Sequence, residues 1–345
     1  MASSASSSTL PPARPMDERN GCDPETFVRE VAPRDRPLVI RGLVADWPAV
    51  AAARAGSRAM AEYLLRHDQG APVNVLVGPP EIGGRYFYND DMNGFNFTTE
   101  RVAFKTFIGA LLKLAEEDQA PALYAGSASA TPLLPDWLAQ NPLPVPAEGA
   151  TPRLWIGNTS RVATHFDTSA NIACVVAGRR RFTLFPPEQI ANLYIGPLDV
   201  TMAGQPASMV DVANPDLQRY PRYAEAWEHA LVADLEPGDA IVMPNLWWHN
   251  VAADGTFNVM VNYWWGQASN ARPFAALVQA IMSLRDLPAA ERAAWRRWFD
   301  HYVFDDEAPQ VADHLPEPAR GILGPPTPER DRRVREYLMR VLTHS

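Results

Sequence analysis

The sequence predicts a mainly β core, built as an antiparallel sandwich or barrel, with helices before and after it. Three observations support this fold class. Residues 122–266 consist of short β-branched and aromatic runs separated by Pro, Gly, Asn and Asp. Residues before this region alternate helical and strand-like segments, and residues after 272 show a helical period. We therefore expect one core domain over residues 21–270 and a helical segment over 271–345.

The N-terminal part predicts helices beside the sheet. Residues 1–20 are small, polar and Pro-rich, and we expect them to be a disordered lead without a signal peptide. Asp23 is placed to cap a short helix that starts at Pro24. Further helices are expected around 60–66 and 104–117, and strands at 37–42, 73–77 and 85–88.

The central region predicts most of the strands. A turn is expected at Pro237–Asp239 and another at Ala177–Gly178. The strands between these turn signals are expected at residues 154–157, 163–167, 172–177, 181–185, 240–243, 249–252 and 258–264.

The C-terminal segment predicts amphipathic helices. The last helix should begin after Thr327, an N-cap followed by Pro328. Its apolar stripe comprises Val334, Tyr337, Leu338, Val341 and Leu342. Such a stripe either covers the β core or forms a symmetric dimer, and we expect a homodimer.

Composition limits the classes of partner. The formal charge of -9 gives no net positive field for nucleic acid or an anionic membrane. Charged residues and 33 prolines interrupt every apolar run, so a membrane helix is not expected. Cys22 and Cys174 do not resemble a disulfide framework, and a reducing cytoplasm fits them best.

One cluster of residues has the pattern of a metal site. His165 and Asp167 are expected in one strand, where alternate side chains share a face. His249, on a later strand, is the best candidate for a third ligand. Two imidazoles and one carboxylate leave positions open on Fe(II) for a chelating co-substrate and for O₂. Taken alone, a His-x-Asp pair is a weak signal.

Several segments together carry a family resemblance. They are RPLVIRGLVADWPAV, NTSRVATHFDTSANIACVVAGRRRFTLFPPEQIANLY, NPD, EPGDAIVMPNLWWHNV and VNYWWG, in this order. This series resembles the cupin-like Jumonji C proteins, which include the asparaginyl hydroxylase that inhibits hypoxia-inducible factor and bacterial relatives. The resemblance implies a double-stranded β-helix, or jelly roll, and an oxygenase that uses Fe(II), 2-oxoglutarate and O₂.

The resemblance also implies roles for single residues. His165, Asp167 and His249 match the iron ligands of the family. Asn171 and Asn262 match polar positions near 2-oxoglutarate, and Tyr124 matches an aromatic contact to it.

The cation that pairs with the distal carboxylate of 2-oxoglutarate is typically Lys, and Arg180 stands in its place. An unpaired buried carboxylate is costly, so a cation belongs there, and a guanidinium can form a bidentate pair. Arg161 is the alternative cation, and a third reading makes residues 179–181 a solvated turn.

The sequence suggests roles for two further features without deciding them. The pairs Trp247–Trp248 and Trp264–Trp265 are expected in the core rather than against a substrate. The long loop from Gly196 to Tyr223 has the composition of a segment that covers an active site.

The function expected is hydroxylation of a protein side chain or a small molecule. The alternatives are a cupin-like metal enzyme that does not use 2-oxoglutarate, and a regulatory or binding module without catalysis.

Overall fold

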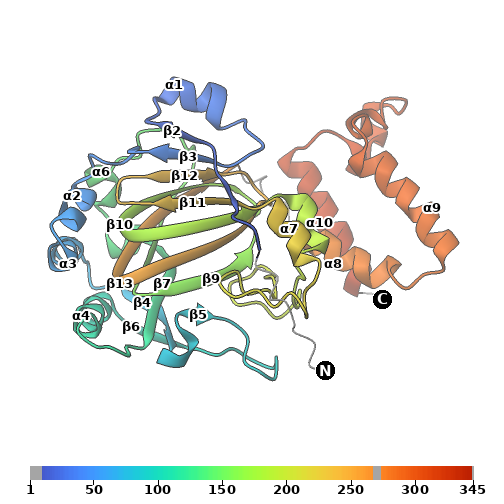
Figure 1. The fold of residues 1–345 in the computed structure, drawn as a ribbon. Helices are drawn as coiled ribbons and strands as arrows, with labels where there is room; N and C mark the ends of the chain where they lie inside the picture. The colour runs from blue at the N-terminus through green and yellow to red at the C-terminus, as the bar shows by residue number, and fades with distance from the viewer. Residues whose placement is uncertain (1–9, 267–272, 344–345) are drawn as a thin grey trace, which may run out of the picture. The chain divides into compact units, whose positions relative to one another are not determined.

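The computed structural model of the 345-residue chain describes residues 10–266 and 273–343. These two stretches belong to two compact units, and every described strand lies in the first (Figure 1). The strands are β1 (Arg14–Pro15), β2 (Glu18–Asn20), β3 (Leu38–Arg41), β4 (Pro72–Gly78), β5 (Arg85–Tyr86), β6 (Thr98–Ala103), β7 (Ala122–Ser129), β8 (Pro152–Gly157), β9 (Ser160–His165), β10 (Ala170–Phe185), β11 (Leu231–Leu235), β12 (Ala240–Met243) and β13 (Trp248–Trp265).

Helices accompany the sheet in the first unit and make up the second. The first unit contains α1 (Pro24–Thr26), η1 (Phe27–Val31), α2 (Pro48–Arg54), α3 (Ser57–Arg66), η2 (Pro80–Ile82), α4 (Phe104–Leu114), α5 (Ala130–Leu133), α6 (Trp137–Gln140), η3 (Pro187–Ala191) and α7 (Tyr223–Glu228). The second contains α8 (Pro273–Leu284), α9 (Ala289–Phe299), η4 (Asp300–Phe304), η5 (Ala308–Gln310), η6 (Glu317–Ala319), η7 (Gly321–Leu323) and α10 (Pro328–Thr343). The predicted caps are confirmed, because the Asp23 carboxylate accepts from Thr26 N and the Thr327 hydroxyl accepts from Arg330 N.

The described strands form one sheet of 13 strands around two long central ones, β10 and β13. The main path of neighbours runs β2-β3-β12-β10-β13-β8-β7-β4-β6. The long strands pair with each other antiparallel over almost their whole length. At one end β10 also pairs with β12 and at the other with β11, while β13 pairs with β8 and then β9. The two long strands therefore link β11 and β12 to β8 and β9, and the predicted mainly β core is confirmed.

Apolar side chains bury both faces of these strands. Helix α4 contributes one apolar face to this burial. Its residues Phe104, Phe107, Ile108 and Leu111 recur at helical spacing and are all buried. This helix packs on β13, and α2 packs on β10. A second apolar cluster includes Phe182 of β10, Met243 of β12, and Val251 and Met260 of β13.

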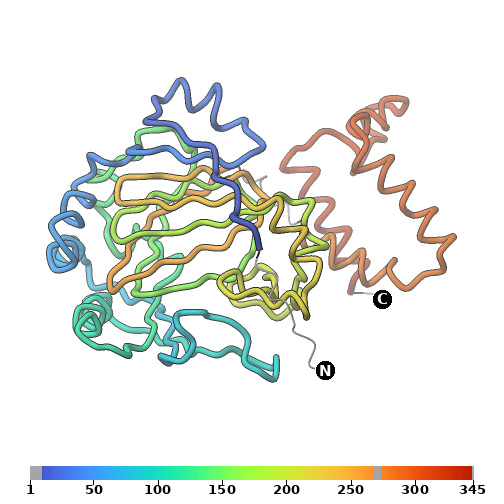
Figure 2. The backbone as a smooth tube through the Cα atoms, viewed as in Figure 1, coloured from blue at the N-terminus to red at the C-terminus, as the bar shows by residue number. Residues whose placement is uncertain are grey.

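The structure corrects the predicted extent of the N-terminal lead. Residues 14–20 are not disordered, because β1 pairs with β11 and β2 pairs with β3, both parallel. This segment, dark blue in Figure 2, is held by the buried side chain of Met16. The Trp227 indole N–H also donates to Pro11 O. Residues 1–9 lie outside the described part of the chain.

The structure also corrects the turn predicted at Ala177–Gly178. That segment lies within β10, where the register with β13 shifts on either side of Ala177. Gly178 has φ +74, and a Cβ atom there would collide with the side chain of Asn258. The expected interruption after Ala252 is absent as well, since β13 runs unbroken from Trp248 to Trp265. Bulges, rather than turns, account for the non-β residues in both strands.

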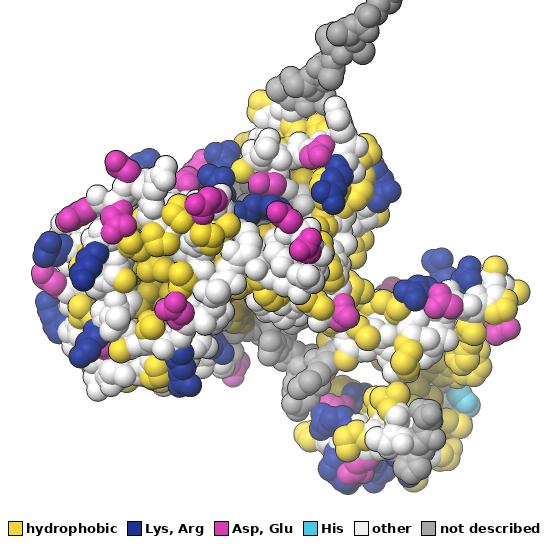
Figure 3. Space-filling view, turned by 90° about the horizontal axis from the view of Figure 1, so that it is seen from below, with side chains coloured by type: hydrophobic (Ala, Val, Ile, Leu, Met, Phe, Trp, Pro, Cys, Tyr) yellow, Lys and Arg dark blue, Asp and Glu magenta, His cyan; other side chains and the backbone are white. Residues whose placement is uncertain are grey.

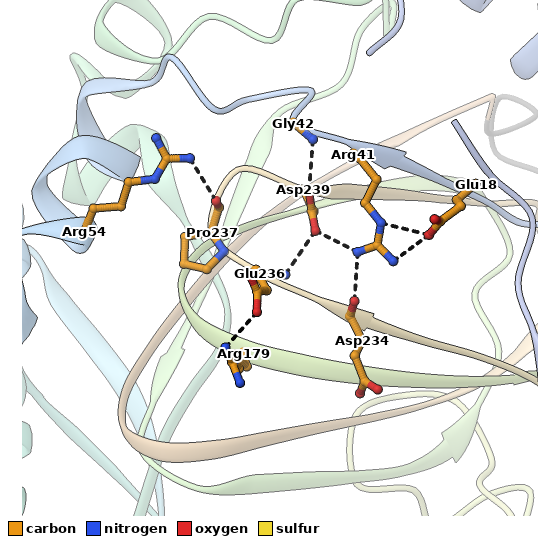
Figure 4. A network of polar contacts seen from close by, with 9 residues as sticks. All are labelled: Glu18, Arg41, Gly42, Arg54, Arg179, Asp234, Glu236, Pro237 and Asp239. Atoms are coloured by element: carbon orange, nitrogen blue, oxygen red, sulfur yellow. Dashed lines mark hydrogen bonds and ion pairs between the residues drawn. The ribbon is translucent and has the colours of Figure 1, made fainter. Parts of the chain in front are cut away.

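The predicted turn at Pro237–Asp239 is confirmed, and a polar network holds it (Figure 4). The Asp239 carboxylate accepts from Gly42 N at 3.0 Å and from Arg41 Nη1 at 2.8 Å. Arg41 also donates to Glu18 through Nε and Nη2, and to Asp234 O through Nη1. The network joins β2, β3 and the turn between β11 and β12.

The second unit exposes most of its apolar side chains. Among residues 273–343 only Ala312 is buried, while Met282 is 69% and Trp298 57% exposed. Figure 3 shows apolar side chains at the surface among acidic and basic ones, which are interspersed on the face drawn. In the described part of the chain, no helix is long and apolar enough to span a bilayer.

Candidate metal centre

Three candidate ligands converge where β9 meets β13. His165 is the last residue of β9 and lies directly opposite His249 in the antiparallel pair. The two imidazole rings are 4.3 Å apart between centroids, and His249 Nε2 is 3.7 Å from Asp167 Oδ2. One ligand atom from each of the three residues lies within 4.8 Å of the others. The predicted set is therefore brought together.

Asp167 reaches this point by a route that differs from the prediction. It does not lie in β9, which ends two residues earlier, so strand alternation is not what aligns it with His165. Instead the main-chain oxygen of Asp167 accepts from Leu246 N at 2.8 Å. That bond ties the carboxylate's residue to the loop that leads into His249.

Backbone hydrogen bonds fix how both histidines face the centre. His165 Nδ1 contacts Ala163 O at 2.9 Å, and His249 Nδ1 contacts Trp247 O at 3.0 Å. A ring that donates from Nδ1 keeps the lone pair on Nε2, which is the tautomer that binds metal. Burial, and then the nearby His165, lower the pKa of His249 to about 4, although Asp167 opposes them. His249 is thus neutral at pH 7.

A chain of hydrogen bonds holds the carboxylate. Asp167 Oδ2 accepts from Trp264 Nε1 at 2.9 Å and from Asn171 Nδ2 at 3.2 Å. Asn171 Oδ1 in turn accepts from Asn262 Nδ2 at 3.0 Å, and Asn262 Oδ1 accepts from Trp155 Nε1 at 2.6 Å. Both amides are buried. Partners of this kind orient a metal ligand and tune its basicity.

Arg180 provides a positive charge in the same cavity. Its side chain is 1% exposed, and Nη2 donates to Trp155 O at 3.1 Å. No described atom lies in good hydrogen-bonding geometry with its Nε or Nη1, although the Tyr124 hydroxyl is near enough to the guanidinium to affect its pKa. Burial lowers the pKa of the guanidinium, and Tyr124 opposes this effect. Buried donors without partners are rare and costly, so this pair of atoms indicates a site for an anion.

Tyr124 lies beside this guanidinium. It is buried on β7 and stacks on Tyr86, with ring centroids 5.7 Å apart. Burial raises the pKa of Tyr124, and Arg180 opposes that rise. The hydroxyl is therefore protonated at neutral pH and can donate a hydrogen bond.

One cavity contains all seven residues singled out in the sequence. Arg161, the alternative cation, is not among those that line it. The lining residues are Tyr124, Trp155, Val162, His165, Asp167, Asn171, Arg180, Phe182, Met243, His249, Val251, Met260 and Asn262.

Because of bulges, both odd- and even-numbered residues of the same strand face this cavity. On β10, Asn171 has an odd number and Arg180 an even one, and on β13 the same holds for Val251 and Asn262. In a regular strand such pairs would point to opposite faces. The register shifts around Ala177 reverse the alternation in the middle of the paired strands.

Two tryptophans contribute contacts that sequence reasoning missed. Trp264 was expected in the core but donates to Asp167, and Trp155 was not singled out at all. Trp264 and Asn262 are two residues apart on β13, so strand alternation places them on the same face. This spacing could have identified Trp264 from the sequence. By contrast, Trp248 and Trp265 pack in the core, against Phe166 and Phe27 respectively.

The loop from Gly196 to Tyr223 is the segment expected to cover the active site. None of the cavity-lining residues comes from this loop. Ser208 N nevertheless donates to Thr164 O, next to His165. The covering role stays a prediction.

The model of the cupin-like domain family matches residues 24–271. The chain belongs to this cupin-like family. The resemblance to Jumonji C proteins is also confirmed, because curated relatives are of that type. A lysine-specific demethylase, JMJ31 of Arabidopsis thaliana, is 35% identical over 112 residues, covering 32% of this chain and 20% of the relative.

Two other relatives match over similar lengths. The tRNA wybutosine-synthesizing protein 5 of Danio rerio is 36% identical, covering 30% of this chain and 28% of the relative. The human HSPB1-associated protein 1 is 35% identical, covering 34% of this chain and 24% of the relative. The matched part therefore spans less than a third of the length of each of these three relatives.

Proposed function

We propose that this cupin-like protein is an Fe(II)- and 2-oxoglutarate-dependent oxygenase that hydroxylates a protein side chain or a small molecule. The observation that carries the proposal is the pairing, within one cavity, of a His-Asp-His cluster with a buried guanidinium that has two unpartnered nitrogen atoms. A ligand with a chelating end and an anionic end would satisfy both.

The donor set fits iron. Two neutral imidazoles and one carboxylate on one side of a metal form the facial triad of non-haem Fe(II) oxygenases, with open positions opposite. His165 and His249 would bind through Nε2, and Asp167 through its carboxylate. When bound, iron supplies the redox chemistry that couples oxidation of a 2-oxo acid by O₂ to oxidation of a C–H bond.

The protein's own residues bind and orient the reactants. Arg180 and Tyr124 would donate to the distal carboxylate of 2-oxoglutarate, and burial strengthens each charged hydrogen bond. Asn171 and Asn262 keep the metal-binding carboxylate in place. Phe182, Met243 and Met260 line the cavity with apolar surface, which limits the entry of water.

The names of the relatives suggest which substrates to test. One is called a lysine-specific demethylase and another a tRNA wybutosine-synthesizing protein. Removal of a methyl group from lysine and hydroxylation of a side chain can both begin with oxidation of a C–H bond. The formal charge of -9 favours a protein or small molecule over RNA.

The test is to supply Fe(II) and 2-oxoglutarate anaerobically, and then to measure O₂ uptake and succinate after air is admitted. We expect stoichiometric iron and succinate formation in the parent, and loss of both in His249→Ala. Iron binding without succinate, across a set of candidate peptides and metabolites, would favour a cupin-like enzyme with other chemistry. No binding of iron or 2-oxoglutarate would favour a regulatory module.

A further inference from the structure

We infer that Trp155 is a positioning residue for the metal centre, which acts by fixing the direction of the hydrogen-bond chain that ends at Asp167. This inference rests on the proposed function in one respect, namely that Asp167 binds a metal. Trp155 lies on β8, lines the cavity and is half-buried. Its indole is the first donor of the chain.

The direction of the chain follows from what each group can do. An indole N–H can only donate, whereas an amide can present either its oxygen or its nitrogen to a neighbour. Because Trp155 Nε1 is 2.6 Å from Asn262, the amide oxygen of Asn262 must face the indole. The nitrogen of Asn262 then faces Asn171, and the nitrogen of Asn171 faces Asp167. An ionised carboxylate can only accept, so both ends of the chain agree.

Without the indole donor, nothing fixes the orientation of the Asn262 amide. Asn262 is fully buried, and a Phe at position 155 would leave its oxygen without a partner. The amide could rotate and present its oxygen to Asn171, and that rotation would turn the donor of Asn171 away from Asp167. The carboxylate would then keep Trp264 as its remaining side-chain donor.

Trp155 also contacts Arg180, but through its main chain. Its carbonyl oxygen accepts from Arg180 Nη2 at 3.1 Å. A substitution of the side chain leaves this oxygen in place. The geometry therefore predicts that changes at Trp155 affect the metal more than they affect the anion bound by Arg180.

The experiment measures the affinity of the full-length protein for Mn(II) alone, by the electron paramagnetic resonance signal of free Mn(II). We expect Trp155→Phe to weaken binding by about 10-fold, the lower end of the range for a direct partner of a metal ligand, because two amides stand between the indole and Asp167. Trp265→Phe is the matched control, because Trp265 packs against Phe27 in the core. It should change the affinity less than about threefold, within the spread of surface and remote substitutions.

A double-mutant cycle separates positioning from a general loss of structure. If Trp155 acts through Asn262, Trp155→Phe should cause no further loss of Mn(II) affinity in an Asn262→Ala background. Losses that multiply would overturn the inference. At saturating Mn(II), Trp155→Phe should lose less affinity for 2-oxoglutarate than Arg180→Met does, because the main-chain oxygen that contacts Arg180 is unchanged.

The outcomes also distinguish this inference from the proposed function. Failure of the parent to bind Mn(II), or equal binding by His249→Ala, refutes the metal centre and the inference with it. Tight binding by the parent and equally tight binding by Trp155→Phe refutes the inference alone. If Trp155→Phe does not fold, the parent labelled with ¹⁵N at tryptophan serves instead. Ten indole signals are expected. If addition of Zn(II) shifts the Trp155 signal no more than it shifts the signals of the core indoles, the inference is refuted.

Discussion

Removal of the Arg180 guanidinium should have opposite effects on binding and on stability. The Arg180 side chain is 1% exposed, and two of its nitrogen atoms make no hydrogen bond of good geometry with the described residues. Desolvation lowers the pKa of Arg180, which means that burial disfavours its charged form in the folded state. An arginine nevertheless stays protonated at neutral pH, so folding must bury a charge.

The expected magnitudes follow from these contacts. A hydrogen bond to a charged group contributes about 1.5–3 kcal/mol, so Arg180→Met should weaken 2-oxoglutarate binding by about 10- to 150-fold. A buried unsatisfied donor costs about 1–3 kcal/mol. The free energy of unfolding of the apo variant should therefore be equal to or higher than that of the apo parent. Arg180→Lys should restore part of the affinity, because a point charge does not reproduce a guanidinium fork.

The assays are an anaerobic titration of 2-oxoglutarate into the Fe(II) protein, followed by its charge-transfer absorption, and urea unfolding of the apoprotein. Arg161→Met is the matched control, since that arginine does not line the cavity. Unchanged affinity in Arg180→Met would refute the assignment of the anion site. A variant that binds weakly and is also less stable by several kcal/mol would refute the claim that the guanidinium is uncompensated.

Three other predictions concern the fold and assembly. Gly178→Ala should lower the free energy of unfolding by more than about 2 kcal/mol in urea, because the added Cβ meets Asn258; Gly204→Ala, at φ +95 in open space, should cost less. Asp239→Asn should lower it by about 1–3 kcal/mol, since the carboxylate accepts from Arg41 and from two main-chain N–H groups; no change would show that the network of Figure 4 is dispensable. Light scattering should find a homodimer that becomes monomeric when the chain ends after Gly321, and a monomeric full chain at micromolar concentration would contradict this.

The sequence predicted the site by motif better than by geometry. The candidate ligands His165, Asp167 and His249 do lie close together, yet the reason given for Asp167 was wrong, because it lies beyond the end of β9. Turn residues at Pro237–Asp239 were correctly interpreted, whereas Gly178 was taken for a turn. A glycine at positive φ serves a turn and a bulge equally well, and sequence alone does not distinguish them.

The same bulge explains why the anion site could not be derived from strand alternation. Counting by twos from Asn171 along β10 places Arg180 on the opposite face, away from the metal ligands. The register shifts on either side of Ala177 reverse that parity, and β13 changes parity with it, so Val251 and Asn262 both reach the cavity. The shifts let the two longest strands line the same cavity, which contains both Asp167 and Arg180. Gly178 fits this position because a Cβ atom there would collide with the side chain of Asn258 on β13. If Arg180 binds the distal carboxylate as proposed, this bulge is what turns its guanidinium toward the cavity that Asp167 also lines.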